Sequence, residues 1–266
     1  MDKLFLNNIE FDITDRCNLN CASCNHFSNF ATTYKEYDVN EFESDVKRLS
    51  ELFIIRKLKL VGGEPFLYSK DLIILIDIML KYFPDSGILV YTNGALVNKI
   101  KELKSKLDAN SNKYGRVRIF ISEYPNKESE LSKSDSFGHG KRPNFRFIDL
   151  NFDGNSDPTI TRTICGCENC PSVYNGKLYI CPITKNFNLV LDYFKLDVGV
   201  RAEDMGCDIH NHSAQYILDY MNNFDRGLYN CRFCGYHRGN KPWSLSKRSI
   251  EEVTLTTNDI EKYRRK

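Results

Sequence analysis

The stretch ITDRCNLNCASCNHFS, residues 13–28, contains three cysteines in the spacing C-x3-C-x2-C: Cys17, Cys21 and Cys24. A structural zinc site usually takes four protein ligands, a disulfide needs an even number of cysteines, and a nucleophilic site needs one. Thiolates are soft ligands, so zinc and an iron–sulfur cluster remain as occupants. A cubane cluster bound by three cysteines keeps one iron without a protein ligand, and that iron can bind a substrate or cofactor.

The composition of the chain is that of an ordinary globular protein. Its 266 residues are 41% hydrophobic and 27% charged, enough for a sizeable core. The formal net charge of +2 gives no reason to expect a nucleic acid or a membrane surface as partner. We find no signal peptide, and the most apolar segment, residues 71–80, contains two aspartates. We therefore expect a cytoplasmic protein without a membrane span.

The distribution of the ten cysteines indicates two metal sites. Without a secretory signal, a reducing compartment is expected, where clustered thiols bind metal more often than they form disulfides. The seven remaining cysteines all lie in the C-terminal part, at Cys165, Cys167, Cys170, Cys181, Cys207, Cys231 and Cys234.

The first 150 residues alternate strand and helix patterns, as parallel β/α units do. Strands are predicted at residues 8–14, 56–63, 87–94, 115–125 and 144–150, and helices at residues 41–53, 69–83 and 95–107. Five strands are fewer than the eight of a closed TIM barrel, so the predicted fold class is α/β, a partial (β/α) TIM-like barrel. The three cysteines follow the first strand, where such folds place their active sites.

The pattern changes after the barrel. Residues 170–182 predict a hairpin with an Asn-Gly turn at Asn175 and Gly176. One helix is predicted to begin near Ser213, and a last one to cover residues 246–253. The expected domains are a barrel at 1–150, a small α+β cluster domain at 151–243 and a helical tail at 244–266.

The cysteine spacing after the first strand resembles the signature of radical S-adenosylmethionine (SAM) enzymes. The resemblance implies a 4Fe–4S cluster on Cys17, Cys21 and Cys24, whose fourth iron is chelated by the amino and carboxylate groups of SAM. One electron from the cluster would split the C–S bond of SAM, and the resulting 5′-deoxyadenosyl radical would abstract a hydrogen atom from a substrate. The family usually has an aromatic residue before the third cysteine, whereas this chain has Ser23.

Three further strand ends resemble motifs of the same family. VGGEP (residues 61–65) resembles its GGEP motif, in which two glycines allow a close backbone approach and Glu64 can accept from the SAM ammonium. YTNG (residues 91–94) and ISEYP (residues 121–125) resemble its TNG and S-x-D/E strand ends. A plain strand-to-helix turn is the alternative for each. The SAM-binding residues implied by the resemblance are Gly62, Gly63, Glu64, Pro65, Thr92, Asn93 and Ser122.

The C-terminal cysteines predict a second site. The hairpin register places Cys170 opposite Cys181, within about 5 Å between Cβ atoms, and Cys231 and Cys234 complete a set of four thiolates. Spacing alone fits zinc or an iron–sulfur cluster. Gly176 followed by Cys181 and a distant C-x2-C resembles the auxiliary-cluster region called SPASM, in its shorter one-cluster form, twitch. This resemblance implies a second 4Fe–4S cluster.

One ligand of the second site is ambiguous. The SPASM spacing favours Cys165 as the first ligand, whereas the hairpin favours Cys170, which we select. Cys167 and Cys207 are expected to be free thiols, with Cys167 kept as a further alternative ligand.

The resemblance implies a radical SAM enzyme with oxidoreductase-like chemistry. A short barrel with one auxiliary cluster is similar to the aminocyclitol dehydrogenase type of butirosin biosynthesis, which favours a sugar, cyclitol or other small metabolite as substrate. The alternative is a peptide-modifying enzyme, but these usually have an added peptide-recognition domain, for which we see no room before the first strand. A non-catalytic zinc or iron–sulfur protein is the alternative of another class. An electron donor such as flavodoxin or ferredoxin is the expected protein partner.

Overall fold

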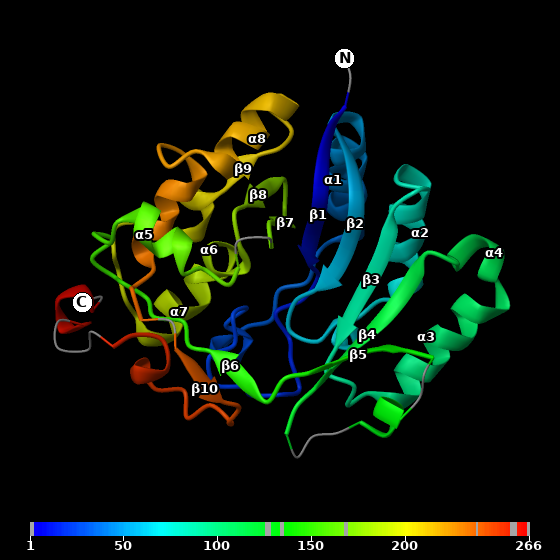
Figure 1. Ribbon diagram of the computed structural model, residues 1–266, viewed down its shortest axis with the longest axis horizontal. Coiled ribbons are helices and arrows are strands. Elements are labelled where there is room, and N and C mark those ends of the chain that lie inside the picture. The colour runs from blue at the N-terminus through cyan, green and yellow to red at the C-terminus, as the bar shows by residue number, and fades with distance from the viewer. Residues whose placement is uncertain are drawn as a thin grey trace. The chain divides into compact units, whose positions relative to one another are not determined.

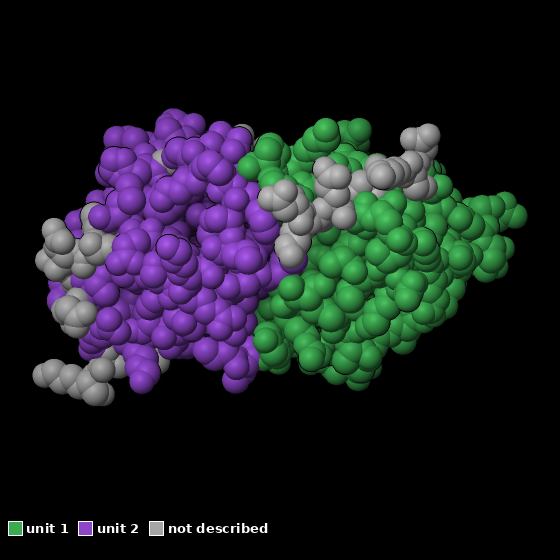
Figure 2. Space-filling view, turned by 90° about the horizontal axis from the view of Figure 1, so that it is seen from below, with its two compact units in different colours: residues 1–18, 34–143, 173–176 green, residues 19–33, 144–172, 177–266 purple. Residues whose placement is uncertain are grey.

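The computed structural model describes residues 3–125, 129–133, 136–167, 170–237, 239–255 and 260–264. The fold is mixed α/β and divides into two compact units (Figure 2). Unit 1 contains residues 1–18, 34–143 and 173–176, and unit 2 contains residues 19–33, 144–172 and 177–266. These units do not follow the linear division at residues 150 and 243, which stays a prediction. In the described part of the chain, no helix has both the length and the apolar character needed to cross a bilayer.

Unit 1 contains a mostly parallel sheet with the strand order β5-β4-β3-β2-β1-β7 (Figure 1). Its strands are β1 (Leu4–Asp12), β2 (Phe53–Val61), β3 (Gly87–Thr92), β4 (Val117–Glu123), β5 (Gly138–Lys141) and β7 (Ser172–Tyr174). The four pairs from β1 to β5 are all parallel. Parallel neighbours joined by helices bring their carboxyl ends to one edge of the sheet, which is where the motif residues lie.

The helices of unit 1 are α1 (Val39–Leu52), α2 (Leu72–Tyr82), α3 (Val97–Ala109), α4 (Ser111–Tyr114) and the 3-10 turns η2 (Pro65–Leu67) and η3 (Glu130–Lys133). The first two begin at aspartates, Asp38 and Asp71, whose side chains accept from the first-turn amides. They lie against one face of the sheet (Figure 1), where the rings of Phe42 and Phe11 are 5.1 Å apart. The predicted β/α order from the first strand to the fourth is confirmed.

The fifth barrel strand was predicted at the wrong place. Residues 144–150 do not join the parallel sheet; Gly138–Lys141 does, beside β4. The sequence of this strand, GHGK, has no apolar alternation. A Cβ on Gly138 or Gly140 would lie 2.8 Å from the ring of Phe120. The ring occupies the space that side chains would fill, so the usual apolar signal of a strand is missing.

Unit 2 is built from short elements. Its helices are α5 (Pro158–Thr163), α6 (Pro182–Lys185), α7 (Phe187–Phe194) and α8 (Ala214–Asn222). Its strands are β6 (Asn144–Arg146) with β10 (Asn240–Pro242), and β8 (Lys177–Tyr179) with β9 (Cys207–Asp208), both pairs antiparallel. Its 3-10 turns are η1 (Ser28–Phe30), η4 (Ala202–Met205), η5 (Gly227–Phe233), η6 (Ile250–Glu252) and η7 (Ile260–Tyr263).

Two local predictions for this part of the chain are confirmed. Asn175 and Gly176 have φ angles of 46° and 74° between β7 and β8, as a type I′ hairpin turn requires. Ser213 caps α8 by accepting from the amide of Tyr216.

The helix predicted over residues 246–253 is absent among the described residues, which form only the short turn η6 there. The hydroxyl of Ser246 donates to Glu252 at 2.5 Å, and the same carboxylate accepts from the amide of Lys247. Arg248 has a φ of 56°. These local side-chain hydrogen bonds compete with helix formation. The left-handed backbone of Arg248 is also incompatible with a right-handed helix through this residue.

Candidate active site and cluster sites

The two glycines of the GGEP motif pack against the segment that leads into Cys17. A Cβ on Gly62 would lie 2.5 Å from the carbonyl oxygen of Thr14, and one on Gly63 would lie 2.2 Å from that of Arg16. Gly62 also has a φ of 137°, and the amide of Gly63 donates to Thr14 at 2.7 Å. Only glycine allows this approach. The end of β2 therefore fixes the path of the chain toward the first cysteine.

Glu64 joins the ends of β2 and β3. Its carboxylate is fully buried and accepts from the hydroxyl of Thr92 at 2.7 Å and from the amides of Asn93 at 2.8 Å and Phe66 at 3.2 Å. Burial raises the pKa of Glu64 to about 7, against the effect of these hydrogen bonds. These three hydrogen bonds join the residues that follow β2 to the end of β3, so Glu64 holds these two neighbouring strand ends together.

Asn93 connects β3 to the cysteine motif within unit 1. Its Nδ2 donates to Oδ1 of Asn18 at 2.7 Å and lies 4.0 Å from Sγ of Cys17. Its Oδ1 accepts from the amide of Ala95 at 3.0 Å. The structure therefore brings together Cys17 and the motif residues Gly62, Gly63, Glu64, Thr92 and Asn93.

Two further predicted residues are buried at neighbouring strand ends. Pro65 begins η2, and Ser122 lies on β4 beside Gly140. Their roles toward SAM, like those of the other motif residues, stay predictions.

Cys21 and Cys24 belong to unit 2, where the indole of Trp243 faces Cys21. Its Nε1 donates to Sγ of Cys21 at 3.3 Å. Burial raises the pKa of Cys21 to about 12, the indole hydrogen bond lowers it, and Cys24 raises it. Ser23 between them has a φ of 56°, which orients the turn. Sequence reasoning missed Trp243; the only signal was a single tryptophan nine residues after the last cysteine.

A pocket in unit 2 contains four of the C-terminal cysteines. Its lining residues are Thr161, Arg162, Cys165, Ile180, Cys181, Ile183, Thr184, Asn230, Cys231 and Cys234. Cys165 follows α5, Cys181 precedes α6, and Cys231 lies in η5, which Cys234 caps. The hydroxyl of Thr161 donates to the carbonyl of Cys231 at 3.1 Å and joins α5 to η5. Three separate segments thus bring four thiols to one pocket.

Burial raises the pKa of two of these thiols, those of Cys181 and Cys231. That of Cys181 is raised to about 12, and Cys234 and Cys165 add to the effect because their charges would repel. The pKa of Cys231 is also raised by burial and by neighbouring cysteines, and Arg162 lowers it. Buried neutral thiols of this kind ionise when a metal replaces their protons.

Cys165 lines the pocket, whereas Cys170, the ligand selected from the hairpin, is not among its lining residues in the described part of the chain. Strand β7 begins only at Ser172, and strand β8 ends at Tyr179. The strands of the hairpin therefore do not extend to Cys170 and Cys181. Cys167 lies close by: its amide donates to Sγ of Cys165 at 3.3 Å, and its thiol accepts from Asn25 at 4.0 Å.

Four thiolates are a ligand set for zinc or for a 4Fe–4S cluster. Zinc needs four sulfurs at about 2.3 Å from one centre. A cubane cluster spaces its four cysteines farther apart, because each cysteine binds a different iron.

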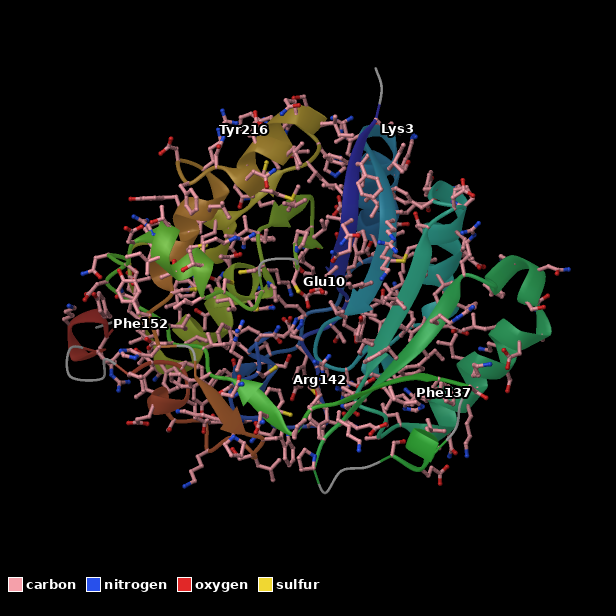
Figure 3. The ribbon with its side chains drawn as sticks, viewed as in Figure 1. Lys3, Glu10, Phe137, Arg142, Phe152 and Tyr216 are labelled. Atoms are coloured by element: carbon pink, nitrogen blue, oxygen red, sulfur yellow. The ribbon has the colours of Figure 1, made fainter. Side chains whose placement is uncertain are left out.

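The face of the unit 1 sheet opposite α1 is polar. Asn8, Glu10 and Asp12 alternate along β1 on this face, and all three are buried. Glu10 (Figure 3) accepts from Nζ of Lys59 on β2 at 3.0 Å. The Oδ1 atom of Asn8 is buried without a hydrogen-bond partner within the described residues. A partly buried ion pair costs desolvation energy and contributes little to stability, so this face is a candidate for ligand binding.

The comparison with protein families agrees with the site. Residues 11–119 match the model of the Radical SAM superfamily. This range runs from β1 into β4 and includes the three-cysteine motif, the GGEP motif and Asn93. Residues 11–119 therefore form a radical SAM domain, and the superfamily implies a 4Fe–4S cluster and SAM as cofactors.

The curated relatives match a part of the chain. The "Putative protein YfkA" of Bacillus subtilis (strain 168) is 32% identical over 98 residues, which cover 36% of this chain and 25% of that protein. A GTP 3',8-cyclase of Campylobacter curvus (strain 525.92) is also 32% identical over 98 residues, covering 34% of this chain and 28% of that protein. The match thus spans less than a third of the length of either relative.

A solved structure, "Crystal structure of BtrN in complex with AdoMet and 2-DOIA", is similar over most of the chain. The TM-score is 0.53 at 18% identity, over 88% of this chain and 94% of that one. This similarity confirms the predicted fold class, a partial barrel of the radical SAM type.

Proposed function

We propose that the chain is a radical SAM enzyme whose first 4Fe–4S cluster is bound by Cys17, Cys21 and Cys24. The observation that carries this proposal is the three-cysteine motif directly after β1, in the domain at residues 11–119. When bound, the cluster and SAM would supply a 5′-deoxyadenosyl radical by one-electron cleavage of the C–S bond, for hydrogen-atom abstraction from a substrate.

Residues of the chain provide a suitable polar environment for these cofactors. Asn93 and Trp243 point N–H groups at Cys17 and Cys21, and such donors stabilise the negative charge of a cluster. Three buried acceptors within or just after the motif lack a partner within the described residues: Oδ1 of Asn20, Oγ of Ser28 and Oδ1 of Asn29. A polar cofactor such as SAM would give these atoms hydrogen-bond donors.

Glu64 would act on SAM indirectly. Its carboxylate is saturated by Thr92, Asn93 and Phe66, so its role would be to hold the ends of β2 and β3 in place. Backbone carbonyls near Gly62 and Gly63 would then accept from the SAM ammonium.

For the second site, we propose a 4Fe–4S cluster bound by Cys165, Cys181, Cys231 and Cys234. The pocket that these four line supports the set. The resemblance of this region to the one-cluster twitch form favours a cluster over zinc. Cys165 thereby replaces Cys170 in the ligand set. Such a cluster would accept the second electron when an alcohol is oxidised to a ketone.

We propose a sugar, cyclitol or other small polar metabolite as the substrate. The polar face formed by Asn8, Glu10, Asp12 and Lys59 supports this choice, because the hydroxyl and amino groups of such a substrate would hydrogen-bond to polar side chains, including the buried Oδ1 of Asn8. The structure of similar fold was solved with AdoMet and 2-DOIA. A one-electron donor such as flavodoxin or ferredoxin would be the protein partner, since the cleavage of SAM consumes one electron.

The test is anaerobic reconstitution with iron and sulfide. The chain should take up about eight iron atoms and, with dithionite and SAM, produce 5′-deoxyadenosine. The triple variant C17A/C21A/C24A should keep about four iron atoms and make no 5′-deoxyadenosine. A fully loaded chain that makes none would contradict the enzyme function, in favour of a structural iron–sulfur protein.

Substrate class can be tested on the same preparation. Turnover of SAM should rise when aminocyclitols or sugars are added, and the double variant E10Q/K59M should lose this stimulation while retaining basal SAM cleavage. Stimulation by peptides alone would instead favour the peptide-modifying alternative.

A further inference from the structure

A C-terminal segment pairs with the cysteine loop inside unit 2. We call residues 243–246 the clamp segment. The amide of Ala22 donates to the carbonyl of Ser244 at 3.0 Å, and the amide of Ser246 donates to the carbonyl of Asn20 at 2.7 Å. Cys21 and Leu245 form an isolated antiparallel bridge at this point. The backbone on both sides of Cys21 is therefore held by a part of the chain that lies beyond the radical SAM domain.

Side chains reinforce this pairing. Nδ2 of Asn20 donates to the carbonyl of Ser246 at 2.9 Å, and Nδ2 of Asn29 donates to the Ser246 hydroxyl at 3.1 Å. That hydroxyl donates in turn to Glu252. Ser246 is thus the centre of a hydrogen-bond network that joins Asn20, within the cysteine motif, and Asn29, just after it, to the clamp segment.

Trp243 is the member of the clamp segment that reaches the sulfur itself. The backbone pairing fixes its position, and its Nε1–H points at Sγ of Cys21 at 3.3 Å. Indole nitrogen is a donor only, so the direction of this hydrogen bond is not in doubt. A donor to a cluster ligand stabilises the more negative, reduced state of the cluster.

We infer that Trp243 is a positioning residue for the first cluster, and that its N–H···S hydrogen bond to Cys21 raises the reduction potential of that cluster. The inference rests on the proposed function, because it requires a cluster on Cys17, Cys21 and Cys24. The bond makes the one-electron reduction of the cluster by the donor protein easier. The C-terminal part of the chain thereby sets how readily the radical SAM site is reduced.

The sharpest test replaces one N–H group. Trp243 is the single tryptophan of the chain, so growth on 3-benzothienylalanine exchanges only this indole for a ring of similar shape without the N–H. Iron content and circular dichroism should stay unchanged. The midpoint potential of the SAM-responsive cluster, followed by electron paramagnetic resonance, should become more negative, and W243F should shift it in the same direction. An unchanged potential in a loaded chain would overturn the inference.

A second measurement tests proximity in the same chain. In C231A/C234A, which should load only the first cluster, the fluorescence of Trp243 should be quenched when iron and sulfide are added. Quenching should be absent in a chain that also lacks the cysteines of the motif. If C231A/C234A is unstable, the unaltered chain can be used instead. Its Trp243 fluorescence is then compared with the electron paramagnetic resonance signal of the cluster that responds to SAM, while iron and sulfide are added stepwise. Bright fluorescence with a loaded first cluster would contradict the inference alone, whereas failure of the motif to load any cluster would contradict the proposed function.

Discussion

At the scale of single residues, the most constrained group of the candidate site is a carboxylate that does not face solvent. Glu64 is fully buried and receives three hydrogen bonds that tie two strand ends together. Burial nevertheless raises its pKa to about 7, because the protein solvates the charge less well than water does. The order of the strand ends beside Cys17 is therefore linked to the protonation of one side chain.

This linkage predicts a pH-dependent stability. The pKa of Glu64 is about 7 in the folded chain and 4.5 in the unfolded one, so the folded state binds the proton more tightly. Protonated Glu64 contributes at most roughly 3 kcal/mol to the free energy of unfolding. This contribution is fully present below pH 4.5 and is lost as the pH rises through about 7. Urea unfolding of the metal-free chain between pH 5 and 8 should show this loss, and E64Q should lack that part of the slope. Parallel pH profiles would contradict the assignment.

The ligand set of the proposed second cluster can be tested at single residues. We expect C165A to lower the iron content from about eight to about four atoms per chain, because Cys165 lines the pocket with Cys181. C170A is the matched control and should remain loaded. Iron and sulfide analysis after anaerobic reconstitution measures both. The opposite result would restore the ligand set expected from the hairpin.

At the scale of elements, the first four strands and three helices were predictable because each buries one apolar face with a regular period. The strand β5 was not, because Gly138 and Gly140 leave the space beside them to the ring of Phe120. The last predicted helix failed for another reason: Ser246 and Glu252 bind each other and nearby amides. Sequence periodicity detects segments that bury one row of side chains. The conformation of these two segments depends on other contacts: a neighbouring ring for β5, and local hydrogen bonds for residues 246–253.

The end of β2 gives a prediction for an element. Alanine at Gly63 would place its Cβ 2.2 Å from the backbone of Arg16, and backbone gives way less easily than a side chain. We expect G63A to lower the free energy of unfolding by roughly 1–3 kcal/mol. G87A is the control on β3, where the nearest atom to a new Cβ is 3.8 Å away. Urea denaturation compares the two, and equal stability would contradict the close approach.

At the scale of the whole molecule, the motifs of the proposed sites were easier to recognise in the sequence than the long-range contacts around them. The motif cysteines, the GGEP motif and the C-x2-C pair were all visible as local patterns. Cys165 was not selected because two spacings disagreed: the SPASM spacing favours Cys165, and the hairpin register favours Cys170. Trp243 was missed because its partner, Cys21, is 222 positions away in the sequence, and such a long-range contact leaves no fixed spacing to recognise.

Cluster loading should stabilise the whole chain. The four pocket cysteines come from three segments that are held mainly by short helices and turns, so a cluster that joins them binds only the folded state. Reconstitution should raise the melting temperature measured anaerobically by calorimetry. In C231A/C234A most of that rise should be lost, and a rise as large as in the parent chain would mean that the pocket is not a cluster site.

The clamp segment also has a consequence for the order of events in the cell. Cys21 and Trp243 are separated by 222 positions, and ribosomes make the N-terminal cysteines first. During most of translation the loop around Cys21 therefore exists without the strand that pairs with it. Its thiols are exposed to oxidation and to adventitious metals until the late residues emerge, so the proposed first cluster should be loaded only after this part of the chain has been synthesised.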